Sequence, residues 1–161
     1  MDEDRLTGRL RALVMRALDE AARRGAGTVE AEHLLLAIAA GTGDVSATLA
    51  AEGLDYDAVD AALKAERAHS LTMAGVTPVD ATALESTPRR SRPTWGASVR
   101  EAMNRAHRRS TRDRHQRGRM AEVDLLVGIL QARLGTVPRA LELVGMDREA
   151  LIGRLQQKSA L

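Results

Sequence analysis

The chain has 161 residues, of which 44% are hydrophobic and 29% are charged, and its formal net charge is +2. It contains no cysteine, which excludes disulfides and thiolate chemistry, and no apolar run approaches the roughly 20 residues that span a bilayer. The acidic amino terminus lacks the apolar region of a signal peptide, so we expect a cytoplasmic protein. Alanine and leucine supply most of the apolar share, whereas Phe is absent and Trp and Tyr occur once each, a composition that predicts an all-α fold.

Charge is distributed unevenly along the sequence. Residues 1–85 carry 8 basic and 15 acidic side chains, whereas residues 86–119 carry 11 arginines against Glu101 and Asp113. The remaining residues balance, with 5 of each sign. The isoelectric point near 9.6 therefore reflects one basic segment in a chain whose first half is acidic.

The first half of the sequence predicts four helices. Apolar residues at three- and four-residue spacing predict a helix from about Leu6 to Arg23. Thr28 is the expected N-cap of a second helix, which carries residues 32–38. A short helix over residues 46–52 should stop at Gly53, and Asp55 should cap a fourth helix that fades near His69.

The second half repeats this order after a long connection. Residues 70–94 lack a clear period and hold three of the four prolines. A helix through residues 99–106 is followed by the arginine-rich stretch 107–119, interpreted as a solvated loop. Helices are then expected over residues 121–131, after Thr136 up to Gly145, and after the capping residue Asp147.

Residues 29–63 and 120–155 are similar to each other. Val29-Glu30-Ala31-Glu32-His33-Leu34-Leu35 aligns with Met120-Ala121-Glu122-Val123-Asp124-Leu125-Leu126, and the offset changes only from 91 to 92 residues by the second match. Such self-similarity is typical of one helical unit used twice. We predict a single domain over residues 1–161, with repeat one at about 5–69, a linker at about 70–94 and repeat two at about 95–157. Duplicated helical units more often form binding surfaces than catalytic centres.

Three segments carry a family resemblance: Leu6-Thr7, Glu32-His33-Leu34-Leu35-Leu36-Ala37-Ile38, and residues 49–54. In these segments the chain resembles the N-terminal Clp repeat domain of ClpA- and ClpC-type AAA+ unfoldases. The resemblance covers nearly the whole chain and implies two pseudo-symmetric four-helix repeats packed as one compact all-α domain. It also implies a domain that receives protein substrates or adaptors and performs no chemistry. The chain has no Gly-x-x-x-x-Gly-Lys-Ser/Thr loop to cradle nucleotide phosphates, so we expect neither ATPase nor protease activity. We expect an accessory factor or decoy of a Clp system.

In some members of this family the acid of the Glu-His block binds phosphorylated arginine. By position the resemblance assigns this role to Glu32, with Thr7 close by, and to nothing acidic at Val123. Asp124 lies one residue further, which turns it by about 100° on a helix. A structural interpretation of Glu32 competes, because a carboxylate in the first turns of a helix is stabilised by the helix dipole.

The remaining polar residues give weaker signals. His33 is expected to be a packed, hydrogen-bonded core histidine, and the four histidines show no metal-ligand spacing, so no metal or cofactor is expected. Trp95 and Tyr56 are interpreted as packing residues rather than binding anchors.

The basic segment supports an alternative function. Six arginines could contact an acidic partner or nucleic-acid phosphates: Arg108, Arg109, Arg112, Arg114, Arg117 and Arg119. No aromatic residue is interleaved to stack on bases, and the acidic first half should repel a polyanion. We therefore favour a solvated loop, or one that pairs with acids of repeat one, over a nucleic-acid-binding segment.

Overall fold

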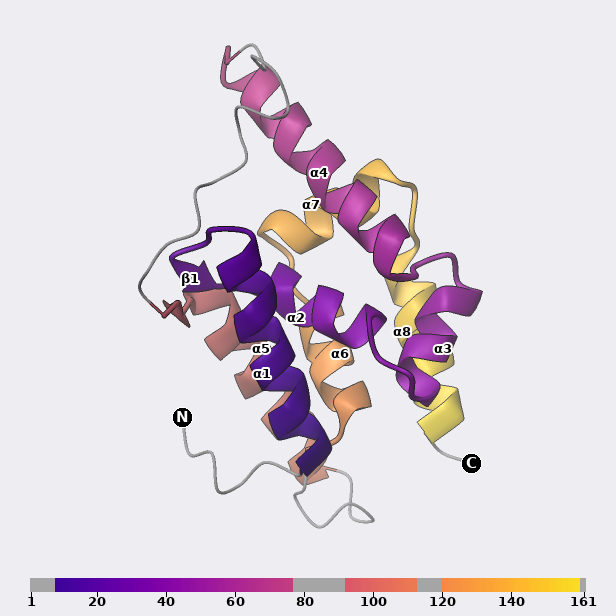
Figure 1. Ribbon diagram of the computed structural model, residues 1–161. Coiled ribbons are helices and arrows are strands. Elements are labelled where there is room, and N and C mark those ends of the chain that lie inside the picture. The colour runs from indigo at the N-terminus through magenta and orange to yellow at the C-terminus, as the bar shows by residue number, and fades with distance from the viewer. Residues whose placement is uncertain (1–7, 77–91, 113–119, 160–161) are drawn as a thin grey trace.

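The computed structural model describes residues 8–76, 92–112 and 120–159, and these residues form eight α-helices and one pair of two-residue strands (Figure 1). The helices are α1 (Gly8–Arg23), α2 (Ala31–Ala39), α3 (Asp44–Ala51), α4 (Tyr56–Met73), α5 (Ala97–Arg112), α6 (Glu122–Leu130), α7 (Thr136–Leu143) and α8 (Arg148–Ser159). The strands are β1 (Thr28–Val29) and β2 (Thr94–Trp95). The predicted all-α fold is confirmed.

Four helices precede β2 and four follow it, in matching order. The helices α1 and α5 have 16 residues each, α2 and α6 have 9 each, and α3 and α7 have 8 each. Only the last pair differs, with 18 residues in α4 and 12 in α8. This order agrees with two sets of four helices, while the exact repeat boundaries remain predictions.

The core is built around α2 and α6, which lie at the centre of the molecule (Figure 1). The helix α1 packs on α2, α5 packs on α6, and α4 packs on α7. A helix that is apolar on all sides must be buried on all sides, which is the case for consecutive residues of α2 and of α6. The fully buried side chains include Leu34, Leu35, Leu36 and Ile38 of α2, and Leu125, Leu126, Ile129 and Leu130 of α6.

Several predicted helix ends are confirmed. The Asp55 carboxylate accepts a hydrogen bond from the amide of Ala58 at 2.8 Å, and Asp147 accepts one from Ala150 at 3.0 Å. Each acid thereby satisfies a free amide of the first helical turn. Gly53 follows the end of α3 with a φ of +78°, a left-handed conformation that glycine adopts without steric cost.

Three predicted helix ends are wrong. Thr28 lies in β1, and the N-cap of α2 is Glu30. The helix α4 continues to Met73 instead of fading near His69. The helix α5 continues to Arg112, so residues 107–112 are not a loop. Arginine is a strong helix former, and cations in a last turn are favoured by the helix dipole, so a run without apolar residues need not end a helix.

The strand pair was not predicted, because two residues are too few to give an alternating pattern. The strands are parallel, with Thr28 opposite Thr94 and Val29 opposite Trp95. The amide of Gly96 donates to the carbonyl of Val29 at 2.9 Å. This pairing places the start of α5 beside the start of α2, although some 65 residues of chain separate them.

Candidate functional site

The start of α2 is capped by residues from both halves of the chain. His33 Nδ1 accepts a hydrogen bond from the amide of Glu30 at 2.9 Å, and Ser98 Oγ accepts one from the amide of Ala31 at 2.8 Å. The Glu30 carboxylate in turn accepts from the amide and the hydroxyl of Ser98, at the start of α5. Gly96 leaves room for this carboxylate, since a Cβ at that position would overlap it. The two helix starts therefore cap each other.

His33 is a buried, hydrogen-bonded histidine, as predicted, with 4% of its surface exposed. Burial, together with the positive charge of Arg24, lowers its pKa. The neutral ring is also the form in which Nδ1 can accept the amide of Glu30. His33 thus serves the structure of the helix start.

Glu32 lies one residue before His33, half-buried, where α2 meets the start of α7. Burial raises the pKa of Glu32, and the negative charges of Glu30 and Glu66 raise it further. Its own backbone amide and a side-chain hydrogen bond with Thr136 act in the opposite sense without cancelling the rise. The fold therefore disfavours the ionised form of the Glu32 side chain.

The more deeply buried acids differ from Glu32 because each has an arginine partner. Glu66 accepts from Arg139 Nε at 2.7 Å, and Asp124 accepts from Arg109 Nε at 2.9 Å. Glu20 is paired with Arg23 at 3.0 Å. Within the described ranges, no arginine or lysine forms an ion pair with Glu32. Glu32 is thus a half-buried carboxylate without an ion-pair partner among the described residues.

We expect Glu32→Gln to stabilise the folded protein at neutral pH. A carboxyl whose pKa is higher in the folded than in the unfolded chain destabilises the fold once pH rises above both pKa values, and the effect disappears below the unfolded value of about 4.3. The gain in unfolding free energy should therefore be present at pH 7 and vanish near pH 4, as measured by urea denaturation. Glu149→Gln, an exposed acid in the first turn of α8, is the control and should show no such gain. An equal gain in both variants would contradict the assignment.

The residues at the start of α6 differ from those at the start of α2. Asp124 lies at the same position of α6 as His33 in α2, and its Oδ2 accepts the amide of Ala121 at 2.9 Å. Its other oxygen is paired with Arg109 of α5, and only 3% of the residue is exposed. Asp124 is therefore engaged within the fold and does not replace the acid that is missing at Val123.

Glu122 is a half-buried acid for which the sequence comparison gave no signal. Its carboxylate lies near Gly43, the residue that precedes α3, much as Glu32 lies near the start of α7. Burial raises the pKa of Glu122, and the nearby charges of Arg16 and Arg9 partly oppose this rise. In the alignment Glu122 falls opposite Ala31, so a position-by-position comparison gave no signal for it.

The six arginines of the basic segment are separated by the fold. Arg109 is held by Asp124, an acid of the second half and not of the first as expected. Arg108 and Arg112 are exposed on the last turns of α5. The predictions for Arg114, Arg117 and Arg119, and that for Thr7, lie outside the described residues.

The two large aromatic side chains pack partly against the core. The Tyr56 hydroxyl donates to Glu20 at 2.6 Å, and the Trp95 carbonyl accepts from Arg100 at 2.7 Å.

In the described part of the chain no three His, Asp or Glu side chains gather as a metal site. No single helix in this part is long and apolar enough to cross a membrane; the bent pair of α2 and α3 passes by length and composition, but α2 is a buried core helix.

These features define a class: an all-α domain of two four-helix sets packed around the central helices α2 and α6, which is the fold of the Clp N-terminal repeat domain. The chain is similar to the N-terminal domain of the caseinolytic protease associated chaperone ClpD from Arabidopsis thaliana, with a TM-score of 0.69, 19% identity, and coverage of 100% of this chain and 98% of that one. A second similar structure, from preliminary structural investigations of a malarial protein secretion system, gives a TM-score of 0.63 and 18% identity over 96% of this chain and 94% of the other. No family model and no curated protein matches the sequence.

Proposed function

We propose that this protein is a non-catalytic protein- or peptide-binding domain that recognises substrates or adaptors of a Clp ATPase–protease system, as an accessory factor or as a decoy. The fold supports this proposal, because the similar ClpD domain belongs to a protease-associated chaperone. The observation that carries it is the unpaired, half-buried carboxylate of Glu32 where α2 meets α7.

A cationic group fits this carboxylate for an electrostatic reason. An incoming guanidinium would supply the positive charge that the buried acids Glu20, Glu66 and Asp124 obtain from arginines of the chain. Leu134, which is 90% exposed and lies two residues before Thr136 in the sequence, offers apolar surface next to the start of α7. We therefore propose a phosphoarginine-bearing or arginine-bearing peptide as the ligand, with Glu32 contacting its guanidinium group.

The experiment is calorimetric titration with a phosphoarginine peptide and with its unphosphorylated counterpart. We expect selective binding of the phosphorylated peptide from the family resemblance alone, because the Glu32 carboxylate attracts the guanidinium group that both peptides carry. A hydrogen bond to a charged group contributes about 1.5–3 kcal/mol, so Glu32→Gln should weaken binding by a factor of about 10–150.

The exposed acid Glu149 supplies the matched control, because Glu149→Gln removes the same charge from the first turn of another helix. Its dissociation constant should equal that of the unchanged protein. Equal binding of both peptides would remove phosphoarginine from the proposal, and full affinity in Glu32→Gln would remove Glu32.

A further inference from the structure

The central helices α2 and α6 close their first turns with chemically different side chains. In α2 the ring of His33 accepts the amide of Glu30, and in α6 the carboxylate of Asp124 accepts the amide of Ala121. Both side chains are buried, with 4% of His33 and 3% of Asp124 exposed. Of these two side-chain types, only histidine ordinarily changes its charge near neutral pH. The two halves of the chain therefore differ in how the start of the central helix responds to acid.

The protonated form of His33 is incompatible with its place in the fold. An imidazolium ion carries a proton on both ring nitrogens, so Nδ1 can no longer accept the amide of Glu30. The ring also lies in the first turn of α2, where the helix dipole disfavours a positive charge. Protonation of His33 therefore leaves the Glu30 amide without its acceptor.

The carboxylate of Glu30 offers a protonated ring a new partner. It accepts from the amide and the hydroxyl of Ser98 at the start of α5, and its negative charge also acts on His33. A hydrogen bond between two charged groups is stronger than one from a neutral hydroxyl or amide. Attraction to an imidazolium ion would draw this carboxylate away from Ser98. One proton would thereby weaken both the cap of α2 and its link to α5.

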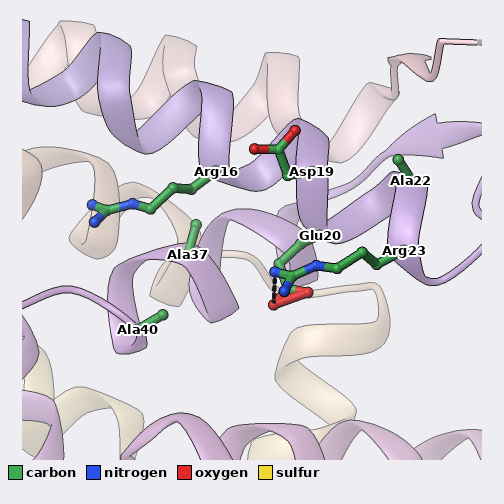
Figure 2. A pocket seen from close by; sticks show the side chains of 7 residues that line it. All are labelled: Arg16, Asp19, Glu20, Ala22, Arg23, Ala37 and Ala40. Atoms are coloured by element: carbon green, nitrogen blue, oxygen red, sulfur yellow. Dashed lines mark ion pairs between the residues drawn. The ribbon is translucent and has the colours of Figure 1, made fainter.

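The other charges near His33 come from the end of α1 and from α4. The charged and titratable groups of this network are Glu20, Arg23, Arg24, Tyr56 and Asp60. Glu20 is paired with Arg23 at 3.0 Å (Figure 2), and Arg24 is paired with Asp60 at 2.6 Å. Burial lowers the pKa of His33 most, Arg24 lowers it further, and Glu20 and Glu30 act in the opposite sense. The ring is therefore neutral in the folded protein at pH 7.5.

We propose that His33 is a pH-sensitive switch at the contact between the two halves of the chain. When the ring is protonated, the Glu30 amide loses its acceptor, the Glu30 carboxylate leaves Ser98, and the start of α2 separates from the start of α5. When the ring loses its proton, the contact forms again. The start of α6, which Asp124 caps, keeps its structure throughout. The switch requires no ligand at Glu32, so it and the proposed function can fail independently.

The test is amide hydrogen exchange, followed by NMR between pH 7.5 and 5.0 and expressed as protection factors. Protection of the Glu30, Ala31 and Ser98 amides should fall below about pH 6.5, by up to about tenfold per pH unit, because the opened state binds a proton at an unperturbed histidine. The fall ends at the pH where the ring is protonated in the closed state as well. Protection of the Ala121 amide should stay constant and is the internal control.

Three variants assign the effect to one side chain. His33→Asp copies the cap of α6 and should make protection of the Glu30 amide constant over this pH range. Glu32→Gln should leave the pH dependence unchanged, because the raised pKa of Glu32 acts on stability in the opposite direction as pH falls. His107→Gln, at an exposed histidine of α5, should also leave it unchanged.

Three outcomes would overturn the proposal. They are constant protection of the Glu30 amide in the unchanged protein, an equal fall at Ala121, and a pH dependence that persists in folded His33→Asp. Thermal melting at pH 7.5 shows which variants are folded. The comparison of Glu30 with Ala121 uses the unchanged protein, so it decides the question even if His33→Asp does not fold.

Discussion

Replacing Gly128 by alanine is expected to lower the free energy of unfolding by about 1–3 kcal/mol, although alanine favours helices. Gly128 lies in α6 where α5 crosses it, and a Cβ at this position would meet the carbonyl oxygen of Ala102 at 2.5 Å and the amide nitrogen of Ala106 at 3.1 Å. Both atoms belong to the backbone of α5, so the two helices would have to move apart. Chemical denaturation at neutral pH measures the loss, and Gly128→Val should cost more.

The matched control is Gly153, a helical glycine of α8 with no atom within 4 Å of the position of a Cβ. Gly153→Ala should raise the free energy of unfolding by about 0.5–1 kcal/mol, because it gains helix propensity without a clash. A lower free energy of unfolding for Gly128→Ala and a higher one for Gly153→Ala would isolate the effect of the contact between α5 and α6. A stabilised Gly128→Ala variant would show that α5 and α6 are not packed this closely.

Replacing Asp124 by alanine should lower the free energy of unfolding by about 3 kcal/mol, the lower end of the range for breaking a buried ion pair. The substitution removes the acceptor of the Ala121 amide and leaves Arg109 without its partner. The loss stays at the lower end because the Arg109 side chain is 28% exposed and can turn toward water.

Two further variants separate the two roles of Asp124. Asp124→Asn keeps an oxygen for the Ala121 amide but removes the charge, so it should cost less than alanine. In a double-mutant cycle with Arg109→Met, the loss in the double variant should be smaller than the sum of the single losses. Strict additivity would mean that the ion pair does not contribute to stability.

The helices were largely predictable because their signals are local. Apolar spacing, the caps Asp55 and Asp147, and the glycines at positive φ all act within a few residues, and the helices begin and end near the expected positions. The start of α2 was predicted wrongly because its capping group is not local. Thr28 has a side chain that can cap a helix, but its backbone lies in β1 and pairs with β2. The capping hydroxyl belongs to Ser98, far along the sequence.

The candidate site was predictable only in part. Glu32 was found through the resemblance of its sequence block to a family, whereas its lack of an ion pair depends on side chains of α4 and α7. The role of Arg109 was hidden for the same reason, since its partner Asp124 lies 15 residues away across a helix–helix contact. The place of Glu122 near the start of α3 also follows from packing and not from alignment.

The reciprocal capping by Glu30 and Ser98 ties the two halves of the chain into one cooperative unit. To open the start of α2, the chain must also release the start of α5, because one hydroxyl and one carboxylate serve both. The central helices bury each other, so neither half retains a complete core when the other unfolds. The slowest amide hydrogens of α2 and α6 should therefore exchange through the same global opening rather than through separate unfolding of each half.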